Sequence, residues 1–151
     1  MVDVVTPADR SRMMAGIQGK NTKPELTVRQ MLFASGYRFR LHRRDLPGAP
    51  DIVMPSRKVA IFVHGCFWHM HSGCRFAKLP STRPEFWQAK LQGNIDRDQA
   101  AVLKLNAMGW RVLWVWECAT RAKVSQEALP VRLRSWIESD STFGEIGEKA
   151  G

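Results

Sequence analysis

The chain has 151 residues, with 23 lysines and arginines against 14 acidic residues and a formal net charge of +9. That length suits one domain with a buried core, and that charge favours a polyanionic partner such as nucleic acid over a basic protein that binds none. Because the sequence has no long apolar run and no apolar signal segment, we expect a soluble, cytoplasmic protein rather than an exported or membrane-spanning one.

Two helices are predicted before the first strand. Thr6-Pro7 is typical of a helix start and predicts a helix within a basic arm that covers residues 1–20. Thr22 and Glu25 have the spacing of a capping box, in which two side chains accept hydrogen bonds from each other's backbone N–H groups. A second helix is therefore predicted over residues 22–35, where a glycine ends it.

Three strands are predicted next. Residues 37–43 alternate between basic and apolar side chains, which predicts a half-buried strand with a basic outer face. The runs 51–54 and 58–63 are rich in valine and isoleucine and are separated by a turn, so they predict two core strands of one sheet. Asp51 stands at the head of the first core strand.

The second half is predicted to contain a loop, a long helix, a third core strand, a final helix and a flexible tail. Their ranges are 64–83, 84–108, 110–116, 125–137 and 141–151. A break in the long helix near Gly93 and the start of the final helix near Pro130 are left open. These elements predict one α/β or α+β domain over residues 21–140, with a small mixed sheet flanked by helices.

The predicted loop holds a dense group of metal-binding side chains. Cys66, His69, His71 and Cys74 lie close together in sequence, and Cys118 follows the third core strand. An odd number of cysteines argues against a disulfide framework, whereas structural zinc takes four thiolate or imidazole ligands. The three cysteines and one histidine satisfy that number, and the spacing leaves His69 and His71 as alternatives. Free buried cysteines with a surface histidine are the competing interpretation.

The two predicted core strands, 51–54 with Asp51 at its head and 58–63, resemble the strand pair that carries the active site in restriction-type nucleases. In that superfamily the second strand normally supplies an acid and a lysine separated by one residue. Here those positions are Phe62 and His64, so the usual pair is absent.

Several longer motifs nevertheless recur in one order, and together they resemble the very-short-patch repair (Vsr) endonucleases, a branch in which this substitution occurs. The resemblance runs from about residue 6 to residue 118. It implies an α/β, restriction-endonuclease-like three-layer fold with a small mixed central sheet flanked by helices and a structural zinc site. The motifs that carry it are His64-Gly65-Cys66-Phe67-Trp68-His69, Phe86-Trp87, Asn94-Ile95-Asp96-Arg97-Asp98 and the run from Gly109 to Cys118.

The resemblance implies a magnesium-dependent catalytic centre. Asp51 would bind the catalytic Mg²⁺ ions, with the backbone carbonyl of Val63 as a further ligand. Glu25 matches an acid that holds metal-bound water, and this role is compatible with its place in the capping box.

The same resemblance implies roles for the histidines. His69 matches the catalytic histidine and Asp98 the carboxylate that orients it, while His64 matches an auxiliary active-site histidine. His71 would then be the zinc ligand that acts with the three cysteines. The implied structural Zn²⁺ ligands are Cys66, His71, Cys74 and Cys118.

The resemblance also implies how a substrate is recognised. Phe67, Trp68 and Trp87 would insert into the base stack beside a mismatch, where imperfect pairing lowers the cost of unstacking. The expected substrate is double-stranded DNA with a T:G mismatch arising from deaminated 5-methylcytosine, nicked 5′ to the mispaired thymine. The family further implies a monomer associated with the bacterial nucleoid and a MutL-type mismatch-repair partner.

Two other functions stay open at this point. One is a related nicking endonuclease with a different mismatch or sequence specificity. The other is a zinc-bearing DNA-binding module without activity, which the set of Asp51, His69 and Asp98 speaks against because binding alone needs no acids facing phosphate.

Overall fold

The computed structural model describes residues 21–148. Its elements in chain order are α2 (Lys23–Ala34), β1 (Arg40–Leu41), β2 (Ile52–Met54), β3 (Val59–His64), α3 (Pro84–Ala107), β4 (Arg111–Trp116), the 3₁₀ helix η1 (Glu117–Thr120), α4 (Lys123–Ile137) and β5 (Phe143–Ile146). The predicted basic arm at residues 1–20 lies outside the described residues.

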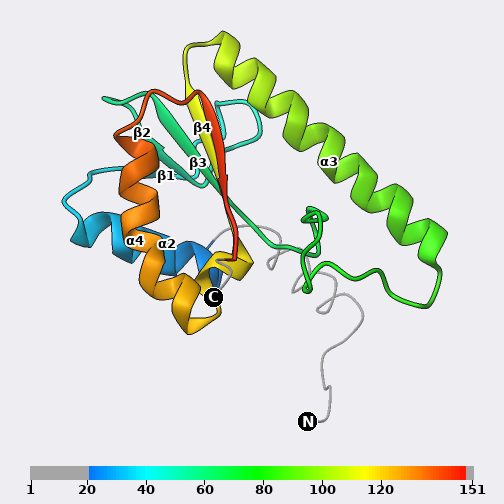
Figure 1. The fold of residues 1–151 in the computed structure, drawn as a ribbon. Helices are drawn as coiled ribbons and strands as arrows, with labels where there is room; N and C mark the ends of the chain where they lie inside the picture. Colours follow the sequence, from blue (N-terminus) through cyan, green and yellow to red (C-terminus); the bar gives the residue numbers. More distant parts are fainter. Residues whose placement is uncertain (1–20, 149–151) are drawn as a thin grey trace.

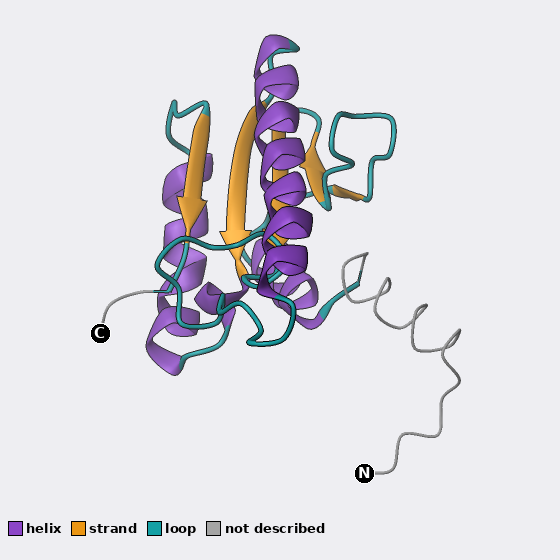
Figure 2. Ribbon diagram, turned by 90° about the vertical axis from the view of Figure 1, so that its right-hand side faces the viewer, coloured by secondary structure: helices purple, strands orange, loops and turns teal. Residues whose placement is uncertain are grey.

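The five strands form one mixed sheet in the order β1-β2-β3-β4-β5. The pairs β1–β2 and β2–β3 are antiparallel, whereas β3–β4 and β4–β5 are parallel and need crossover connections. α3 makes the first crossover on one face of the sheet, and α4 makes the second on the opposite face beside α2 (Figure 1). Figure 2 shows α3 in front of the sheet and the other helices behind it. The expected α/β class with a mixed sheet flanked by helices is confirmed.

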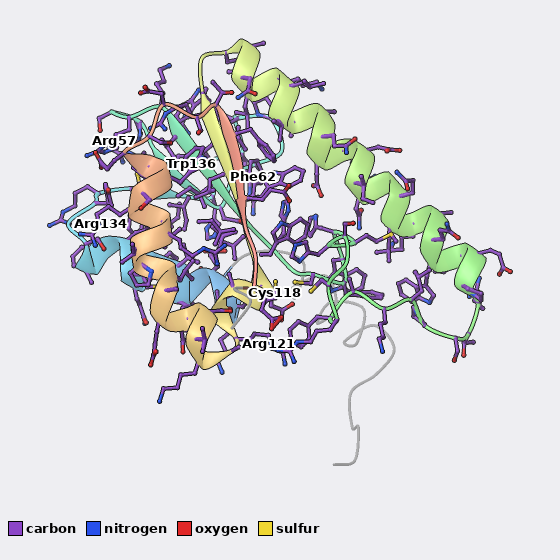
Figure 3. All side chains as sticks on the ribbon, in the orientation of Figure 1. Arg57, Phe62, Cys118, Arg121, Arg134 and Trp136 are labelled. Atoms are coloured by element: carbon purple, nitrogen blue, oxygen red, sulfur yellow. The ribbon has the colours of Figure 1, made fainter. Side chains whose placement is uncertain are left out.

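Each face of the sheet buries its own apolar core. Figure 3 shows Phe62 on the side of α3 and Trp136 on the side of α4. This two-sided burial explains why β3 is a nearly continuous apolar run rather than an alternating one. The core toward α2 and α4 includes Val28, Leu32, Ile61, Leu113, Val115, Leu129 and Leu133, and the core toward α3 includes Val53, Ala60, Phe62, Leu105 and Val112.

Helix α2 begins as the sequence predicts. The Thr22 side chain accepts a hydrogen bond from the backbone N–H of Glu25 at 3.4 Å. In a capping box the Glu25 side chain would accept from the Thr22 N–H. Here its Oε1 accepts from the N–H of the preceding residue, Asn21, at 3.1 Å. The Glu25 side chain is 1% exposed and lies on the inner face with Val28 and Leu32. A carboxylate is thus held inside the fold, next to the sheet.

Helices α3 and α4 resolve the two questions that the sequence leaves open. α3 runs without a break through Gly93, and only Leu91, Ala101 and Leu105 are buried along its described length. Its first half extends beyond the sheet, alongside the loop 65–83 (Figure 1). α4 contains Pro130 in its interior, where burial of the neighbouring Leu129 and Leu133 offsets the lost backbone hydrogen bond.

Two sequence predictions differ from the structure. The alternating segment 37–43 forms a strand only at Arg40–Leu41, because β2, its partner, is itself short. The prediction of a flexible tail at 141–151 was wrong for residues 143–146, which form β5 and pair in parallel with β4. Long-range pairing supplies the hydrogen bonds of β5, so no local pattern indicates it.

Among residues 21–148, the structure has no helix that is long and apolar enough to cross a membrane.

The loop that leads into β2 packs against the α3 side of the sheet at Gly48. This residue has a φ of +75°, and a Cβ placed there would lie 2.7 Å from Ala101 Cβ and 3.1 Å from the Phe62 ring. We predict that Gly48→Ala lowers the free energy of unfolding by about 3 kcal/mol through backbone strain and overpacking. Urea denaturation measures this change.

Gly36→Ala is the matched control, because Gly36 has a φ of +92° with open space around the added Cβ. It should lower the free energy of unfolding by about 1 kcal/mol through backbone strain alone. Equal losses in the two variants would contradict the packing role of Gly48.

Candidate functional site

The register of the parallel strands β3 and β4 brings residues that are distant in sequence together at the C-terminal ends of these two strands. His64 pairs with Trp116 at the last position of both strands. Cys66 and Cys118 each follow two residues later, so the loop after β3 and η1 begin side by side. Figure 3 shows Cys118 at this end of the sheet, beside the loop.

Four side chains of metal-binding types converge beyond the C-terminal ends of β3 and β4. One ligand atom from each of Cys66, His71, Cys74 and Cys118 lies within 4.8 Å of the others. His71 Nδ1 is 3.6 Å from Cys66 Sγ and 3.4 Å from Cys118 Sγ. Tetrahedral zinc, with bonds of about 2.1 Å to nitrogen and 2.3 Å to sulfur, would separate such ligands by about 3.6 Å. The donor set therefore fits zinc, and His71 rather than His69 belongs to it.

The protonation of the cysteine thiols bears on how this site would bind a metal ion. Cys66 and Cys118 are both fully buried, and burial raises the pKa of each thiol. Without a cation the two thiols stay protonated near neutral pH, and ligation of a metal would release these protons.

The end of β5 closes over this cluster. The Glu148 N–H donates to Cys118 Sγ at 3.1 Å, and a Cβ at Gly147 would lie 2.9 Å from His71 Cε1. Arg75 forms an ion pair with Glu148 at 2.8 Å. On the other side, the His71 ring stacks on Trp116 at 4.1 Å between centroids. Sequence analysis missed the contacts of Gly147 and Glu148 because it assigned residues 141–151 to a tail.

A second group contains His64, His69 and Asp98, whose ligand atoms also lie within 4.8 Å. His69 Nδ1 and Asp98 Oδ2 are 2.5 Å apart, so Nδ1–H donates to the carboxylate and Nε2 is the ring nitrogen outside this contact. The two side chains are 23% and 18% exposed, which leaves them accessible from one side. The predicted pairing of His69 with Asp98 is thus present as a contact.

His64 supports His69 from behind. The two imidazole rings stack with centroids 3.9 Å apart and planes 6° from parallel. His64 is 3% exposed, and burial, followed by the neighbouring histidines, holds its pKa well below the ordinary value. Its Nδ1 is buried without a hydrogen-bond partner among the described residues. The His64 ring is therefore neutral near neutral pH and packs face to face against His69, the candidate catalytic histidine.

The third group contains Glu25, His42 and Asp51. Asp51 precedes β2, and its Oδ2 accepts a hydrogen bond from the Val63 N–H at 2.8 Å. Burial, together with the charge of Glu25, raises the pKa of Asp51 to about 7 despite that hydrogen bond. Hard cations such as Mg²⁺ bind oxygen ligands, and the neighbouring carboxylates of Glu25 and Asp51 supply such oxygens.

His42 is a site residue that sequence analysis missed. Its Nε2 lies 2.8 Å from Glu25 Oε2. The sequence shows it only as one of several basic residues in an alternating segment, and no motif distinguishes it. The contact depends on a tertiary approach of the loop after β1 to α2.

Adjacent residues of β3 connect the second and third groups. Val63 contacts Asp51 through its N–H, and the next residue, His64, stacks on His69. The two groups therefore contact consecutive residues at the end of β3, shortly before Cys66 of the four-ligand group.

The three aromatic residues predicted as wedges lie together. Phe67 is 5.0 Å from Trp68 and 5.6 Å from Trp87 between ring centroids, and all three side chains are partly exposed. Asn94 Nδ2 on α3 donates to the Trp68 carbonyl at 2.8 Å, one turn before Asp98. α3 thus holds the loop at both the aromatic pair and the histidine.

Comparisons with known proteins point to one family. The family model described as DNA mismatch endonuclease Vsr matches residues 2–75. The chain is 49% identical over 138 residues to the type II nicking enzyme V.XorIIP of Xanthomonas oryzae pv. oryzae, covering 91% of this chain and 98% of that protein. It is 42% identical over 148 residues to the DNA mismatch endonuclease Vsr of Escherichia coli K12, covering 97% and 94%. The type II nicking enzyme V.NmeAIP of Neisseria meningitidis is 40% identical over 123 residues, covering 82% and 87%.

The raised pKa of Asp51 predicts how the protein responds to pH when no divalent cation is added. The folded protein binds this proton more tightly than the unfolded chain does. The resulting stability is complete below the ordinary pKa of 3.8 and is lost as the pH rises to about 7. We expect Asp51→Asn to raise the free energy of unfolding at pH 8 relative to the parent by on the order of 3 kcal/mol, with no gain at pH 3.

Urea denaturation across this pH range measures the effect, and Asp45→Asn is the control because Asp45 is exposed and Arg43 lowers its pKa to about 2. Parallel stability curves for Asp51→Asn and the parent would show that the Asp51 carboxyl ionises normally in the fold.

Proposed function

Because the chain belongs to the Vsr family of DNA mismatch endonucleases, and is therefore a DNA-cleaving hydrolase, we propose that it nicks duplex DNA 5′ to the mispaired thymine of a T:G mismatch. The observation that carries this proposal is that the Asp51 group and the His69–Asp98 pair contact consecutive residues of β3, Val63 and His64. A nuclease needs a group that moves a proton and a group that gathers cations at one phosphate.

His69 is the proposed general base. With Nδ1–H directed at Asp98, Nε2 is the atom that accepts a proton from the attacking water. The water oxygen forms a bond to phosphorus, the bond from phosphorus to the 3′ oxygen breaks, and that oxygen takes a proton from solvent, leaving 3′-hydroxyl and 5′-phosphate ends. Asp98 stabilises the imidazolium that forms, and the stacked His64 limits movement of the ring.

Asp51 is the proposed magnesium ligand, with the Val63 carbonyl as a further ligand and Glu25 holding metal-bound water. Two neighbouring carboxylates and a raised Asp51 pKa support this assignment, because a divalent cation relieves their repulsion. Bound Mg²⁺ would stabilise negative charge on the scissile phosphate and its leaving oxygen.

Cys66, His71, Cys74 and Cys118 are the proposed ligands of a structural zinc ion. Their separations fit a tetrahedral site, and the loop between them carries the proposed wedge and catalytic histidine. Such a closed site would fix the loop rather than take part in the reaction. We assign the endonuclease domain to the restriction-endonuclease-like fold, and we extend it beyond the expected residues 21–140 because β5 is part of its sheet.

Phe67, Trp68 and Trp87 are the proposed intercalating side chains. All three are partly exposed; Phe67 and Trp68 lie in the same loop as His69, and Trp87 lies in the first turn of α3. Apolar side chains that enter a base step unstack it, and a wobble pair lowers that cost. The aromatic cluster thereby couples mismatch recognition to the position of the scissile phosphate.

The biological setting follows from the same family membership. We propose that the enzyme acts as a monomer in the cytoplasm of a bacterium, at the nucleoid, and starts very short patch repair of deaminated 5-methylcytosine. A MutL-type repair protein is the proposed partner. The net charge of +9 supports association with DNA at physiological salt.

A second candidate is a nicking enzyme with a different mismatch or sequence specificity. Relatives named as type II nicking enzymes, such as V.XorIIP, favour it. Side-by-side cleavage of T:G duplexes with varied neighbours, other mismatches and matched duplexes distinguishes the two, because only the first candidate requires the T:G pair.

We predict that His69→Ala slows nicking of a T:G duplex in Mg²⁺ roughly 10²- to 10⁴-fold, since proton transfer at Nε2 is lost. Single-turnover cleavage on a denaturing gel measures the rate, and fluorescence anisotropy checks that duplex binding persists. A matched T:A duplex should stay intact with the parent enzyme. Nicking by His69→Ala at the parent rate would exclude His69 as the base.

We also predict that Cys74→Ala loses bound zinc and unfolds at a lower temperature than the parent, because three ligands cannot complete a structural site. Cys74 is partly exposed, so its replacement removes a ligand with little loss of packing. Mass spectrometry of the metal content and thermal denaturation measure the two effects. His69→Ala is the matched control and should retain zinc, since His69 lies outside the four-ligand group. A zinc-free parent protein would contradict the assignment.

A further inference from the structure

His42 contacts both acidic residues of the third group, one through its side chain and one through its backbone. Its side chain reaches Glu25 on α2, with Nε2 2.8 Å from Oε2. Its backbone N–H donates to the carbonyl of Asp51 at 2.9 Å. One residue thus contacts the helix that carries the first acid and the backbone of the second.

Glu25 receives donors on both carboxylate oxygens. The Asn21 N–H reaches Oε1 at 3.1 Å, while Arg29 Nη1 and His42 Nε2 reach Oε2 at 3.3 and 2.8 Å. An ionised carboxylate only accepts hydrogen bonds, so His42 donates through Nε2–H. Of the two side-chain donors, His42 makes the shorter contact and is the less exposed, at 18% against 25% for Arg29.

The backbone at His42 also favours a particular kind of residue. Its φ of +52° is in the left-handed region, which histidine and asparagine adopt more readily than most other residues. This conformation lets the backbone N–H face Asp51 while the ring reaches Glu25. The backbone and the side chain therefore make separable contributions.

We propose that His42 is a positioning residue that fixes the Glu25 carboxylate beside Asp51, so that the two acids together hold a divalent cation and its water. The inference rests on the proposed function, because it takes Asp51 as the cation ligand. His42 itself touches neither the cation nor the DNA. Removal of the Nε2–H donor lets Glu25 rotate toward Arg29 and separates the pair.

Two substitutions distinguish the role of the Nε2–H donor of His42 from that of its left-handed backbone conformation. His42→Asn tolerates the left-handed conformation but is too short to reach Glu25, whereas His42→Gln places an amide N–H near the position of Nε2. We expect His42→Asn to raise the Mg²⁺ concentration for half-maximal nicking about tenfold, the range seen for partners of metal ligands, with the rate at saturating Mg²⁺ close to that of the parent. His42→Gln should restore the parent's Mg²⁺ dependence.

Electron paramagnetic resonance of Mn²⁺ gives a readout that does not depend on catalysis. Titration of Mn²⁺ into each protein bound to the nicked product duplex should show about tenfold weaker binding for His42→Asn and parent-like binding for His42→Gln. Thermal denaturation without added Mn²⁺ should give a midpoint for His42→Asn close to the parent's and a lower one for His42→Gln, because glutamine adopts the left-handed conformation less readily.

The outcomes distinguish the inference from the function on which it rests. Parent-like Mn²⁺ and Mg²⁺ dependence in His42→Asn would overturn the positioning role and leave the proposed nuclease intact. Weak binding in both variants would instead make His42 a direct nitrogen ligand and overturn the proposal. A parent protein that neither nicks T:G duplexes in Mg²⁺ nor binds Mn²⁺ would overturn the proposed function and this inference with it.

Discussion

The parallel pairing of β3 with β4 is the constraint on which the site depends. It aligns His64 with Trp116, and so places Cys66 and Cys118 within reach of one another although they are far apart in sequence. The antiparallel pairing of β2 with β3 brings the start of β2, and with it Asp51, to the same edge. A change of the β3–β4 register by one residue would point alternate side chains to the opposite face and move Cys118 away from Cys66.

The loop after β3 is held from three sides, which is unusual for a segment without regular structure. The four-ligand cluster holds its middle, Asn94 and Asp98 on α3 hold its first half, and the end of β5 covers Cys118 and His71. Preorganisation of this kind places reactive groups before a substrate arrives and avoids the entropic cost of ordering a loop on binding. The proposed metal site and α3 would therefore both order this loop, by different contacts.

Sequence alone predicted much of the framework. Buried apolar runs located β2, β3 and β4, the Thr22–Glu25 spacing located the start of α2, and the density of cysteine and histidine indicated a metal cluster. These features succeed because they depend on local periodicity, capping or ligand chemistry. β5, His42 and the Glu148 contact to Cys118 were missed, because each depends on partners that are distant in sequence.

By itself, then, the sequence determined the α/β class, the family and the candidate chemical groups, because composition, periodicity and motif order are properties of the chain alone. The family resemblance implied His71 as the histidine that joins the cysteines, and the tertiary structure gives the physical reason. His71 stacks on Trp116 beside Cys118, whereas His69 stacks on His64 and turns to Asp98. Spacing could not separate two imidazoles only two residues apart, because the choice depends on which strand end and which helix each ring meets after the sheet has formed.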